Sequence, residues 1–229
     1  MAATVGKGYK ESQPGKQYSS TMNMEPTQRE SDRFCYVKFY GKDIRTTVTN
    51  KGEAVAKWVE RVRNYYGKRG DNLIVGLDAE GYFTKPKGGT MHWAILQLCV
   101  GTTCLVYQIY NTDYIPEELV KFLEDTRNTF VGVAIKDDVR LLQEDYGLKV
   151  SNILDLRSLA AHKLNSSLYE KSGLKSLAKE FLHVELEKSY KIHYNWRADR
   201  LNKAQIEYAS RDAAASFYIG VELNSIKAN

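Results

Sequence analysis

The sequence has few cysteines, few histidines and no long apolar run, and these shortages exclude several classes of protein. No apolar stretch approaches the ~18 residues of a membrane span, and residues 1–4 do not begin a signal-peptide core, so we expect neither a membrane partner nor a secretory leader. Three cysteines are too few, and odd in number, for a disulfide framework, which predicts reduced thiols and a cytoplasmic or nuclear protein. Cys99 and Cys104 could flank a hairpin, but we expect them to be small core residues.

The overall composition is that of a globular protein with a basic balance. Hydrophobic residues make up 43% and charged residues 27% of 229 residues, enough for one domain with an added arm. The net charge of +5 is compatible with a polyanionic partner and does not establish one. Residues 1–31 contain almost no branched aliphatic side chains, so we expect a disordered N-terminal arm before a domain over 32–229.

Hydrophobic periodicity predicts an α/β fold. Strands come first, followed by one strand–helix–strand crossover and then mostly helices, an order that favours a mixed sheet with helices on both faces. The predicted strands cover residues 34–40, 44–49, 72–80, 93–100, 103–110 and 129–135, with a short extended piece at 151–155. The predicted helices cover residues 52–65, 116–125, 136–146, 156–164, 174–181 and 202–223.

The stretch from Asn72 to Glu80 reads as a buried strand that ends in two acids. Side chains alternate across a strand, so Asp78 and Glu80 point to the same face. Two adjacent carboxylates repel each other, and a divalent cation between them would remove that conflict. With 28 acidic residues in the chain, chance alone supplies about one such spacing, so other acids must converge on the pair to give it meaning.

Two further acidic positions lie where they could join this pair. Asp137 and Asp138 follow the strand predicted over 129–135, and we expect one of the two to be the helix N-cap. Tyr208 and Asp212 are four residues apart and therefore on one face of the last predicted helix. Alanines surround Asp212, which permits close packing on the sheet, and a buried aspartate there is costly unless it is paired or bound to metal.

Two predicted loops are basic. Residues 82–91 include Lys85 and Lys87 and could contact phosphates, or could equally be a plain solvated connection. Residues 185–200 are basic and aromatic without clear periodicity, which is typical of an ordered loop. His193 and the cations around it could contact substrate phosphates, although charged loops are usually only solvated.

The motif set Asp78-x-Glu80, Asp138 and Tyr208-x-x-x-Asp212 resembles the DEDD exonuclease superfamily, tyrosine subtype, which has the ribonuclease H-like, DnaQ-like fold. The resemblance is greatest to the Werner-type exonuclease domain and to its small plant relatives. Some of those plant proteins are implicated in clearing small-RNA-associated fragments, and some form ring-shaped hexamers. Further stretches that carry the resemblance are residues 75–80, 96–101, 130–133, 174–178 and the pair Asn195-Trp196.

The chain departs from the Werner-type pattern at two places. Gly81 follows Glu80 where that pattern usually has a tryptophan. Val139 and Arg140 follow Asp138 where an aromatic residue is common. Both differences bear on how the terminal base is held, so they affect substrate preference more than chemistry.

The resemblance implies hydrolysis of phosphodiester bonds from a 3′ end by two divalent ions roughly 4 Å apart, with release of nucleoside 5′-monophosphates. Asp78 would bridge both ions, Glu80 and Asp212 would complete one site, and Asp138 would hold the second ion. Tyr208 would orient or deprotonate the water. Mg²⁺ or Mn²⁺ suits an all-oxygen set, whereas zinc would need histidine or cysteine.

The partners implied by the resemblance are the 3′ end of single-stranded RNA or DNA, further copies of the chain in a homohexamer, and a small-RNA effector complex. RNA is favoured over DNA only by the similarity to the plant proteins, because recognition of the 2′-hydroxyl leaves no readable motif. A non-catalytic binding protein of the same fold is the alternative of a different class. The presence of all five motif residues argues against it.

Overall fold

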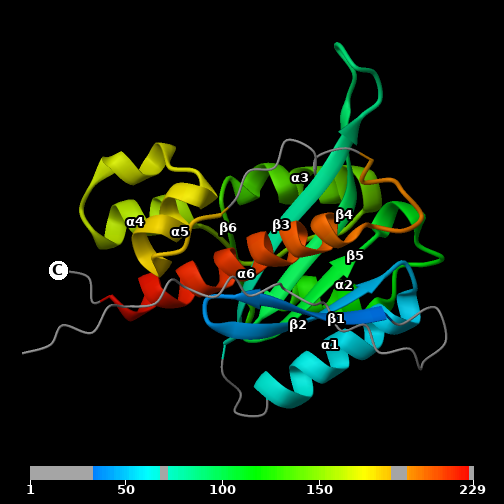
Figure 1. Ribbon diagram of the computed structural model, residues 1–229, viewed down its shortest axis with the longest axis horizontal. Helices are drawn as coiled ribbons and strands as arrows, with labels where there is room; N and C mark the ends of the chain where they lie inside the picture. Colours follow the sequence, from blue (N-terminus) through cyan, green and yellow to red (C-terminus); the bar gives the residue numbers. More distant parts are fainter. Residues whose placement is uncertain (1–32, 68–71, 187–194, 227–229) are drawn as a thin grey trace, which may run out of the picture.

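The computed structural model describes residues 33–67, 72–186 and 195–226, and the remaining residues are drawn as a thin grey trace in Figure 1. A single sheet of seven strands in the order β1-β2-β5-β4-β3-β6-β7 forms the centre. The strands are Arg33–Phe39 (β1), Lys42–Thr49 (β2), Ile74–Phe83 (β3), Met91–Val100 (β4), Thr103–Tyr107 (β5), Thr129–Gly132 (β6) and Ile153–Asp155 (β7). The helices are Gly52–Tyr66 (α1), Glu117–Glu124 (α2), Ile135–Tyr146 (α3), Leu156–Lys163 (α4), Leu174–Leu182 (α5) and Lys203–Ser225 (α6).

The strand pairing makes the sheet mixed, as the sequence predicts. β1–β2, β3–β4 and β4–β5 are antiparallel pairs, whereas β2–β5, β3–β6 and β6–β7 are parallel. Short 3₁₀ turns at Ile109–Asn111 (η1) and Ser167–Lys171 (η2) complete the described elements. Among the helices of the described segments, none combines the length and the apolar character needed to cross a bilayer.

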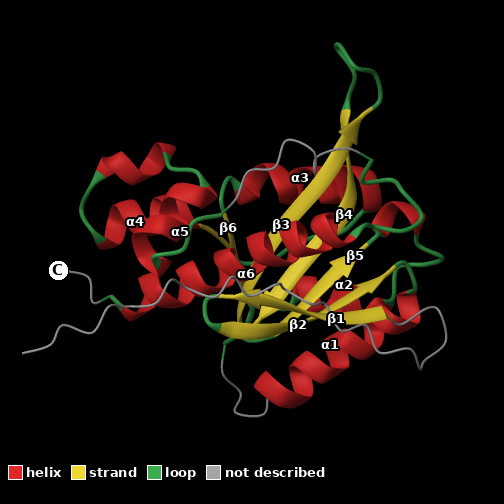
Figure 2. Ribbon diagram, in the orientation of Figure 1, coloured by secondary structure: helices red, strands yellow, loops and turns green. Residues whose placement is uncertain are grey.

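Helices cover both faces of the sheet and bury a separate core on each side (Figure 2). The core on one face contains residues of α4, α5 and α6 together with β1. The core on the other face contains residues of α1, α2 and α3. α6 lies across the front of the sheet in Figure 1 and contacts β3 most extensively of all strands.

The long helix α6 begins at a well-formed cap and carries small residues toward β3. Asn202 accepts a hydrogen bond from the Gln205 backbone N–H, and the Gln205 side chain accepts one from Asn202, so two otherwise unpaired donors of the first turn are satisfied. Gly76 of β3 faces this helix. A Cβ at Gly76 would lie 2.1 Å from the Ala213 carbonyl oxygen, so only glycine permits the approach.

The β3–β4 hairpin is longer than the sequence predicts. The segment 82–91, expected to be a loop, contributes to both strands, because β3 continues to Phe83 and β4 begins at Met91. Thr84 donates its backbone N–H to the Thr90 carbonyl at 3.0 Å, which closes the hairpin. Residues 82–91 therefore form an arm that projects at the top of Figure 1.

The expectation that all cysteines are reduced is wrong for one pair. Cys99 and Cys104 form a disulfide, because the β4–β5 register places them directly opposite each other with Cα atoms 4.2 Å apart. Both are fully buried, in keeping with the expectation of core residues, and Cys35 is a buried free thiol. The expected arm over residues 1–31 lies outside the described residues.

Substitution of Gly76 by alanine should destabilise the protein by about 1–3 kcal/mol or more. The new Cβ would meet backbone atoms, the Ala213 oxygen at 2.1 Å and the Phe217 nitrogen at 2.5 Å, and neither can move without shifting α6. Gly173→Ala is the matched control, because nothing lies within 4 Å of a Cβ there. Urea unfolding of both variants tests this, and equal stability of the two would contradict it.

Candidate active site

β3 presents Asp78 and Glu80 on the sheet face that α6 covers. Glu80 lies opposite Ile95 of β4, which is buried in the core on the α6 side, and opposite residues of antiparallel strands share a face. Asp78 lies opposite Gln97. A β-bulge between Glu80 and Gly81 then shifts the register at the end of the pair. The predicted common orientation of the two acids is confirmed.

α6 adds the third carboxylate. One oxygen each from Asp78, Glu80 and Asp212 can be chosen so that all lie within 4.8 Å of one another, and all three residues are half-buried. The Tyr208 hydroxyl hydrogen-bonds to Asp212 from the preceding turn of the same helix. Tyr208 is also half-buried, and its ring centroid lies 6.2 Å from that of the buried Trp196. The structure therefore brings together four of the five residues singled out from the sequence.

Asp138 lies at the edge of this cluster on the first turn of α3. Its charge contributes to the raised pKa of both Asp78 and Glu80, so its carboxylate is close to theirs. It is half-buried, whereas Asp137 is exposed. Its backbone oxygen accepts a hydrogen bond of 3.0 Å from the indole N–H of Trp93. Of the two adjacent aspartates, Asp138 is the one that faces the acidic cluster.

The expectation that Asp137 or Asp138 is the N-cap of this helix is wrong. The N-cap is Ala134, whose left-handed backbone with φ 59° turns the chain from β6 into α3 several residues earlier. Asp155, at the end of the neighbouring strand β7, accepts the Ala134 N–H at 3.1 Å. Asp155 also caps α4 and pairs with Arg157, so this acid is structural. Because β6 also ends at Gly132, the predicted strand over 129–135 is too long.

The four carboxyls of the cluster are hard to ionise together. Desolvation, and then the negative charges of Asp212, Glu80 and Asp138, raise the pKa of Asp78 well above its usual range. Desolvation with neighbouring acids raises the pKa of Glu80 to about 8 and that of Asp138 to about 7. Desolvation raises the pKa of Asp212 to about 7, although Tyr208 opposes this. Desolvation and these acids also raise the pKa of Tyr208, which keeps its hydroxyl protonated.

The donor set fits a hard divalent cation. Asp78, Glu80 and Asp212 offer converging oxygens with Asp138 at their edge, and a cation among them would offset the repulsion that helps to hold their pKa values high. Gln97 adds a further polar group beside Asp78. It is fully buried, and within the described part of the chain neither its amide nitrogen nor its amide oxygen has a hydrogen-bond partner. Such an unpaired amide is costly, which fits a site completed by a bound group.

Sequence reasoning missed the residues that support this site from β4. Trp93 donates its backbone N–H to Asp145 at 2.9 Å, and the His92 ring contacts the same carboxylate at 2.7 Å. Trp93 also explains Gly81, because a Cβ there would lie 2.2 Å from the His92 oxygen and 2.7 Å from the Trp93 ring. The two contacts with Asp145 join residues 52 and 53 positions apart, and no local pattern signals them.

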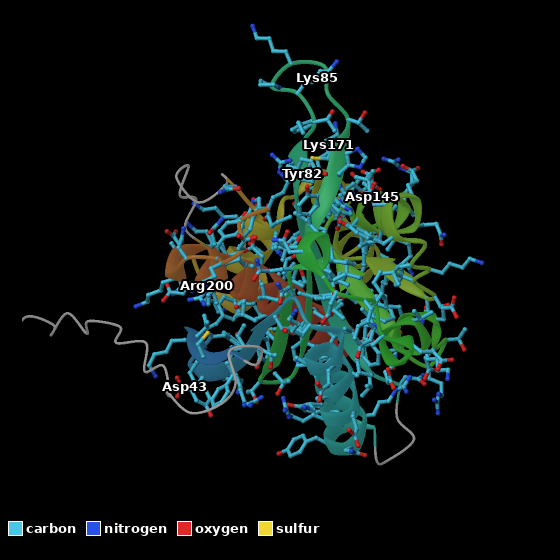
Figure 3. All side chains as sticks on the ribbon, turned by 90° about the vertical axis from the view of Figure 1, so that its right-hand side faces the viewer. Asp43, Tyr82, Lys85, Asp145, Lys171 and Arg200 are labelled. Atoms are coloured by element: carbon cyan, nitrogen blue, oxygen red, sulfur yellow. A yellow bond between two sulfur atoms is a disulfide. The ribbon has the colours of Figure 1, made fainter. Side chains whose placement is uncertain are left out.

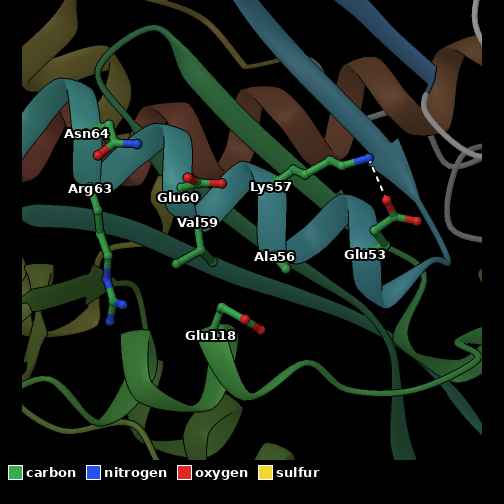
Figure 4. Close-up of a pocket in the computed structure, with 8 residues that line it drawn as sticks. All are labelled: Glu53, Ala56, Lys57, Val59, Glu60, Arg63, Asn64 and Glu118. Atoms are coloured by element: carbon green, nitrogen blue, oxygen red, sulfur yellow. Dashed lines mark ion pairs between the residues drawn. The ribbon is translucent and has the colours of Figure 1, made fainter.

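The predicted phosphate contacts of His193 lie outside the described residues. A pocket of about 330 Å³ between α1 and α2 is lined by residues of mixed charge, including Glu53, Lys57 and Arg63 (Figure 4). Those helices cover the face of the sheet opposite to α6, so the pocket is remote from Asp78.

Comparison with known sequences identifies one family. Residues 46–226 match the sequence profile described as 3′-5′ exonuclease. A 3′-5′ exonuclease of Arabidopsis thaliana is 32% identical over 199 residues, which are 85% of this chain and 64% of that protein. The RISC-interacting clearing 3′-5′ exoribonuclease 1 of Arabidopsis thaliana is 32% identical over 95 residues, 40% of this chain and 48% of that protein. The chain spans about a quarter to two thirds of the length of the first curated relatives that it matches.

Comparison with solved structures agrees on the fold. Escherichia coli RNase D, described as an exoribonuclease involved in structured RNA processing, superposes with a TM-score of 0.63 at 24% identity. The match covers 77% of this chain and 44% of that one. The fold is therefore the ribonuclease H-like fold expected from the sequence, a mixed sheet with helices on both faces.

In EDTA, the free energy of unfolding should fall as the pH rises from about 4 to about 8. The four acids have usual pKa values of 3.8 and 4.5. The pKa values of Glu80, Asp138 and Asp212 are raised to about 7 to 8 and that of Asp78 well above its usual range, so the folded chain binds more protons in this window. The acids with lowered pKa, Asp113, Asp125 and Asp155, contribute stability that is lost only below about pH 4.

Urea unfolding at several pH values measures this slope. A double variant, Asp78→Asn with Asp212→Asn, should show a smaller decline because two of the repelling charges are gone. Added Mg²⁺ at pH 8 should restore stability to the unsubstituted chain, by about 2.7 kcal/mol at a hundred times its Kd. Stability in EDTA that stays constant or rises between pH 5 and 8 would contradict the electrostatic account of the site.

Proposed function

Because the chain belongs to the 3′-5′ exonuclease family, we propose that it hydrolyses single-stranded nucleic acid, with RNA preferred, from the 3′ end. The observation that carries this proposal is the convergence of Asp78, Glu80 and Asp212 from two elements far apart in the sequence. We place the catalytic domain at residues 32–229. The products are a nucleoside 5′-monophosphate and a strand shortened by one nucleotide.

The cofactor proposed for this site is Mg²⁺ or Mn²⁺, as two ions. Asp78, Glu80 and Asp212 would hold one, with Asp78 shared, and Asp138 would hold the other. When bound, the ions supply positive charge that acidifies water and stabilises the attacking and leaving oxygens. The carboxylates would fix the positions of the ions, because they extend from a strand and two helices that are held in place by the cores on the two faces of the sheet.

Tyr208 is assigned the role of orienting the attacking water. Its hydroxyl is tied to Asp212, and its pKa is raised by desolvation and by the neighbouring acids, so it remains a donor rather than a base. The water gives its proton to bulk solvent as its oxygen bonds to phosphorus. The bond from phosphorus to the 3′ oxygen of the preceding nucleotide breaks, and that oxygen takes up a proton from solvent to become the new 3′-hydroxyl.

The proposed preference for RNA is supported by similarity to a protein named as an exoribonuclease. One Arabidopsis relative is named an exoribonuclease that interacts with RISC, and this likeness extends the proposal to a small-RNA effector complex as partner. A homohexamer is proposed from the resemblance to small plant members alone. The alternatives are a DNA-preferring exonuclease and a non-catalytic binding protein of the same fold.

Asp78→Ala should lower the rate of 3′-end shortening by about 10³-fold or more, because the shared ligand of the proposed site is removed. Asp212→Asn should have a comparable effect. The measurement is digestion of 3′-labelled and 5′-labelled single-stranded RNA and DNA with Mg²⁺, Mn²⁺ or EDTA. Asp43→Ala is the matched control, since Asp43 is an exposed acid paired with Lys38 at the β1–β2 turn.

The label pattern separates the alternatives. Loss of the 3′ label first, with a ladder from the 5′ label, identifies the direction, and the ratio of RNA to DNA rates identifies the substrate. Full activity in purified Asp78→Ala would reject the proposed mechanism. Binding without degradation by the unsubstituted chain would favour the non-catalytic alternative.

A further inference from the structure

An aromatic and cationic cluster lies directly beside the acidic site. Tyr82 follows Glu80 by two residues on β3, about 7 Å along the strand. Its ring meets that of Tyr110 edge-on, with centroids 5.4 Å apart and an interplanar angle of 77°. The guanidinium of Arg197 lies 4.4 Å from the centroid of Tyr82 and 5.8 Å from that of Tyr110. We call these three residues the Tyr–Arg platform.

The platform is accessible. Tyr110 is 45% exposed, Arg197 is exposed and Tyr82 is half-buried. Within the described segments, Arg197 forms no ion pair, so its charge is available to a ligand in addition to its contact with the rings. The exposed ring of Tyr110 beside a guanidinium without an acidic partner offers stacking and cation–π contacts at one place.

Hydrogen bonds from two side chains to the backbone hold the platform in position. The amide of Gln108, which is only 5% exposed, donates to the Ala198 backbone oxygen at 2.7 Å. The Asn111 amide donates to the Arg197 and Ala198 backbone oxygens, each at 3.1 Å. The 3₁₀ turn that carries Tyr110 is thereby fixed to the segment that carries Arg197. Such prior ordering lowers the entropy cost of binding a ligand.

One dipeptide connects the platform to the acidic cluster. Trp196 points inward and is buried against the ring of Tyr208, which hydrogen-bonds to Asp212. The next residue, Arg197, points outward over Tyr82. Tyr82 itself packs against the core on the α6 side, the same side as Asp78. The platform and the acids are therefore neighbouring parts of one surface.

The β3–β4 arm continues this surface with positive charge. Lys85 and Lys87 are exposed in the turn of the arm, and Phe83 is 63% exposed beneath them. Figure 3 shows Lys85 at the tip and Tyr82 lower on the same arm. From the acids outward, the chain therefore presents a tyrosine and a phenylalanine at the end of β3 and then the lysines in the turn beyond it.

We propose that the Tyr–Arg platform and the arm lysines bind the part of a single strand that lies 5′ of the terminal nucleotide. This inference rests on the proposed function. Bases would stack on Tyr110 and on the Arg197 guanidinium that lies over Tyr82, Arg197 would also contact phosphate, and Lys85 and Lys87 would neutralise phosphates farther along. Base–aromatic stacking tolerates every base, so the surface selects for single-strandedness and length rather than for sequence. An acidic peptide would satisfy the lysines but would leave the exposed rings without partners.

The test compares strand lengths. Oligo(A) of 3, 6 and 12 nucleotides with a 5′ fluorophore is titrated with protein carrying Asp78→Asn, and anisotropy gives each Kd. Adding Tyr110→Ala or Arg197→Gln should weaken binding of the 12-mer about 5- to 150-fold, the equivalent of one lost stacking contact of about 1–3 kcal/mol. The trimer should lose much less. Tyr65→Ala is the matched control, because Tyr65 is 77% exposed on α1, across the sheet from α6.

The arm is tested by the salt dependence of binding. Lys85→Gln combined with Lys87→Gln should reduce the slope of log K against log salt by about 0.7 for each phosphate contact removed. Lys42→Gln, at the exposed β1–β2 turn, should leave the slope unchanged. If poly-glutamate displaces the 12-mer as effectively as unlabelled oligo(A) does, the assignment of the surface to nucleic acid is overturned.

Activity separates failure of this inference from failure of the proposed function. In the catalytically intact chain, Tyr110→Ala should lower kcat/KM far more for the 12-mer than for a dinucleotide. Equal losses at all lengths, or no loss at any, would overturn the platform even though 3′ shortening persists. If the unsubstituted chain does not shorten any strand, but length-dependent binding is present and is lost in Tyr110→Ala, the exonuclease function is rejected and the binding surface is retained. Thermal unfolding of each variant verifies folding, and Arg197→Gln stands in should Tyr110→Ala unfold.

Discussion

The contact between the backbones of α6 and β3 at Gly76 is the constraint on which the site depends. Because position 76 has no Cβ, the helix can lie against the strand. This approach brings a carboxylate oxygen of Asp212 within 4.8 Å of one of Asp78. The alanines at 213, 214 and 215 serve the same approach from the helix side. The gain from this packing offsets the cost of confining carboxylates that repel one another. The same geometry that makes the acids unfavourable alone makes them suited to a divalent cation.

The distribution of the two cores explains why the acids cannot move apart. β3 is covered by α6 on one face and by the α1–α2–α3 layer on the other, so neither Asp78 nor Glu80 can relieve repulsion by shifting its backbone. Asp138 is held separately, through the Trp93 indole on its backbone oxygen and through the strained Ala134 cap that Asp155 secures. The repulsion among the acids therefore raises their pKa values and does not displace the backbone that carries them.

Features that depend on local periodicity could be predicted from the sequence, and those that depend on register could not. The common face of Asp78 and Glu80 follows from strand alternation, and that of Tyr208 and Asp212 from helical spacing. The N-cap at Ala134 requires Asp155 from another strand, and the Cys99–Cys104 disulfide requires the β4–β5 register. The long arm was missed because Gly88, Gly89 and Pro86 suggest a loop, whereas pairing with β4 extends β3 past the bulge to Phe83.

Gly81 shows how a departure from a family pattern can be read physically. The bulge after Glu80 brings the His92 carbonyl and the Trp93 ring against position 81, so a tryptophan there has no space. Trp93 does not replace it as a stacking surface, because that residue is buried and its N–H is committed to Asp138. An aromatic face for a base must therefore come from beyond the bulge, where Tyr82 and Tyr110 meet under Arg197. The lack of room for a side chain at position 81 and the position of the platform beyond it thus both follow from the bulge in the β3–β4 pair.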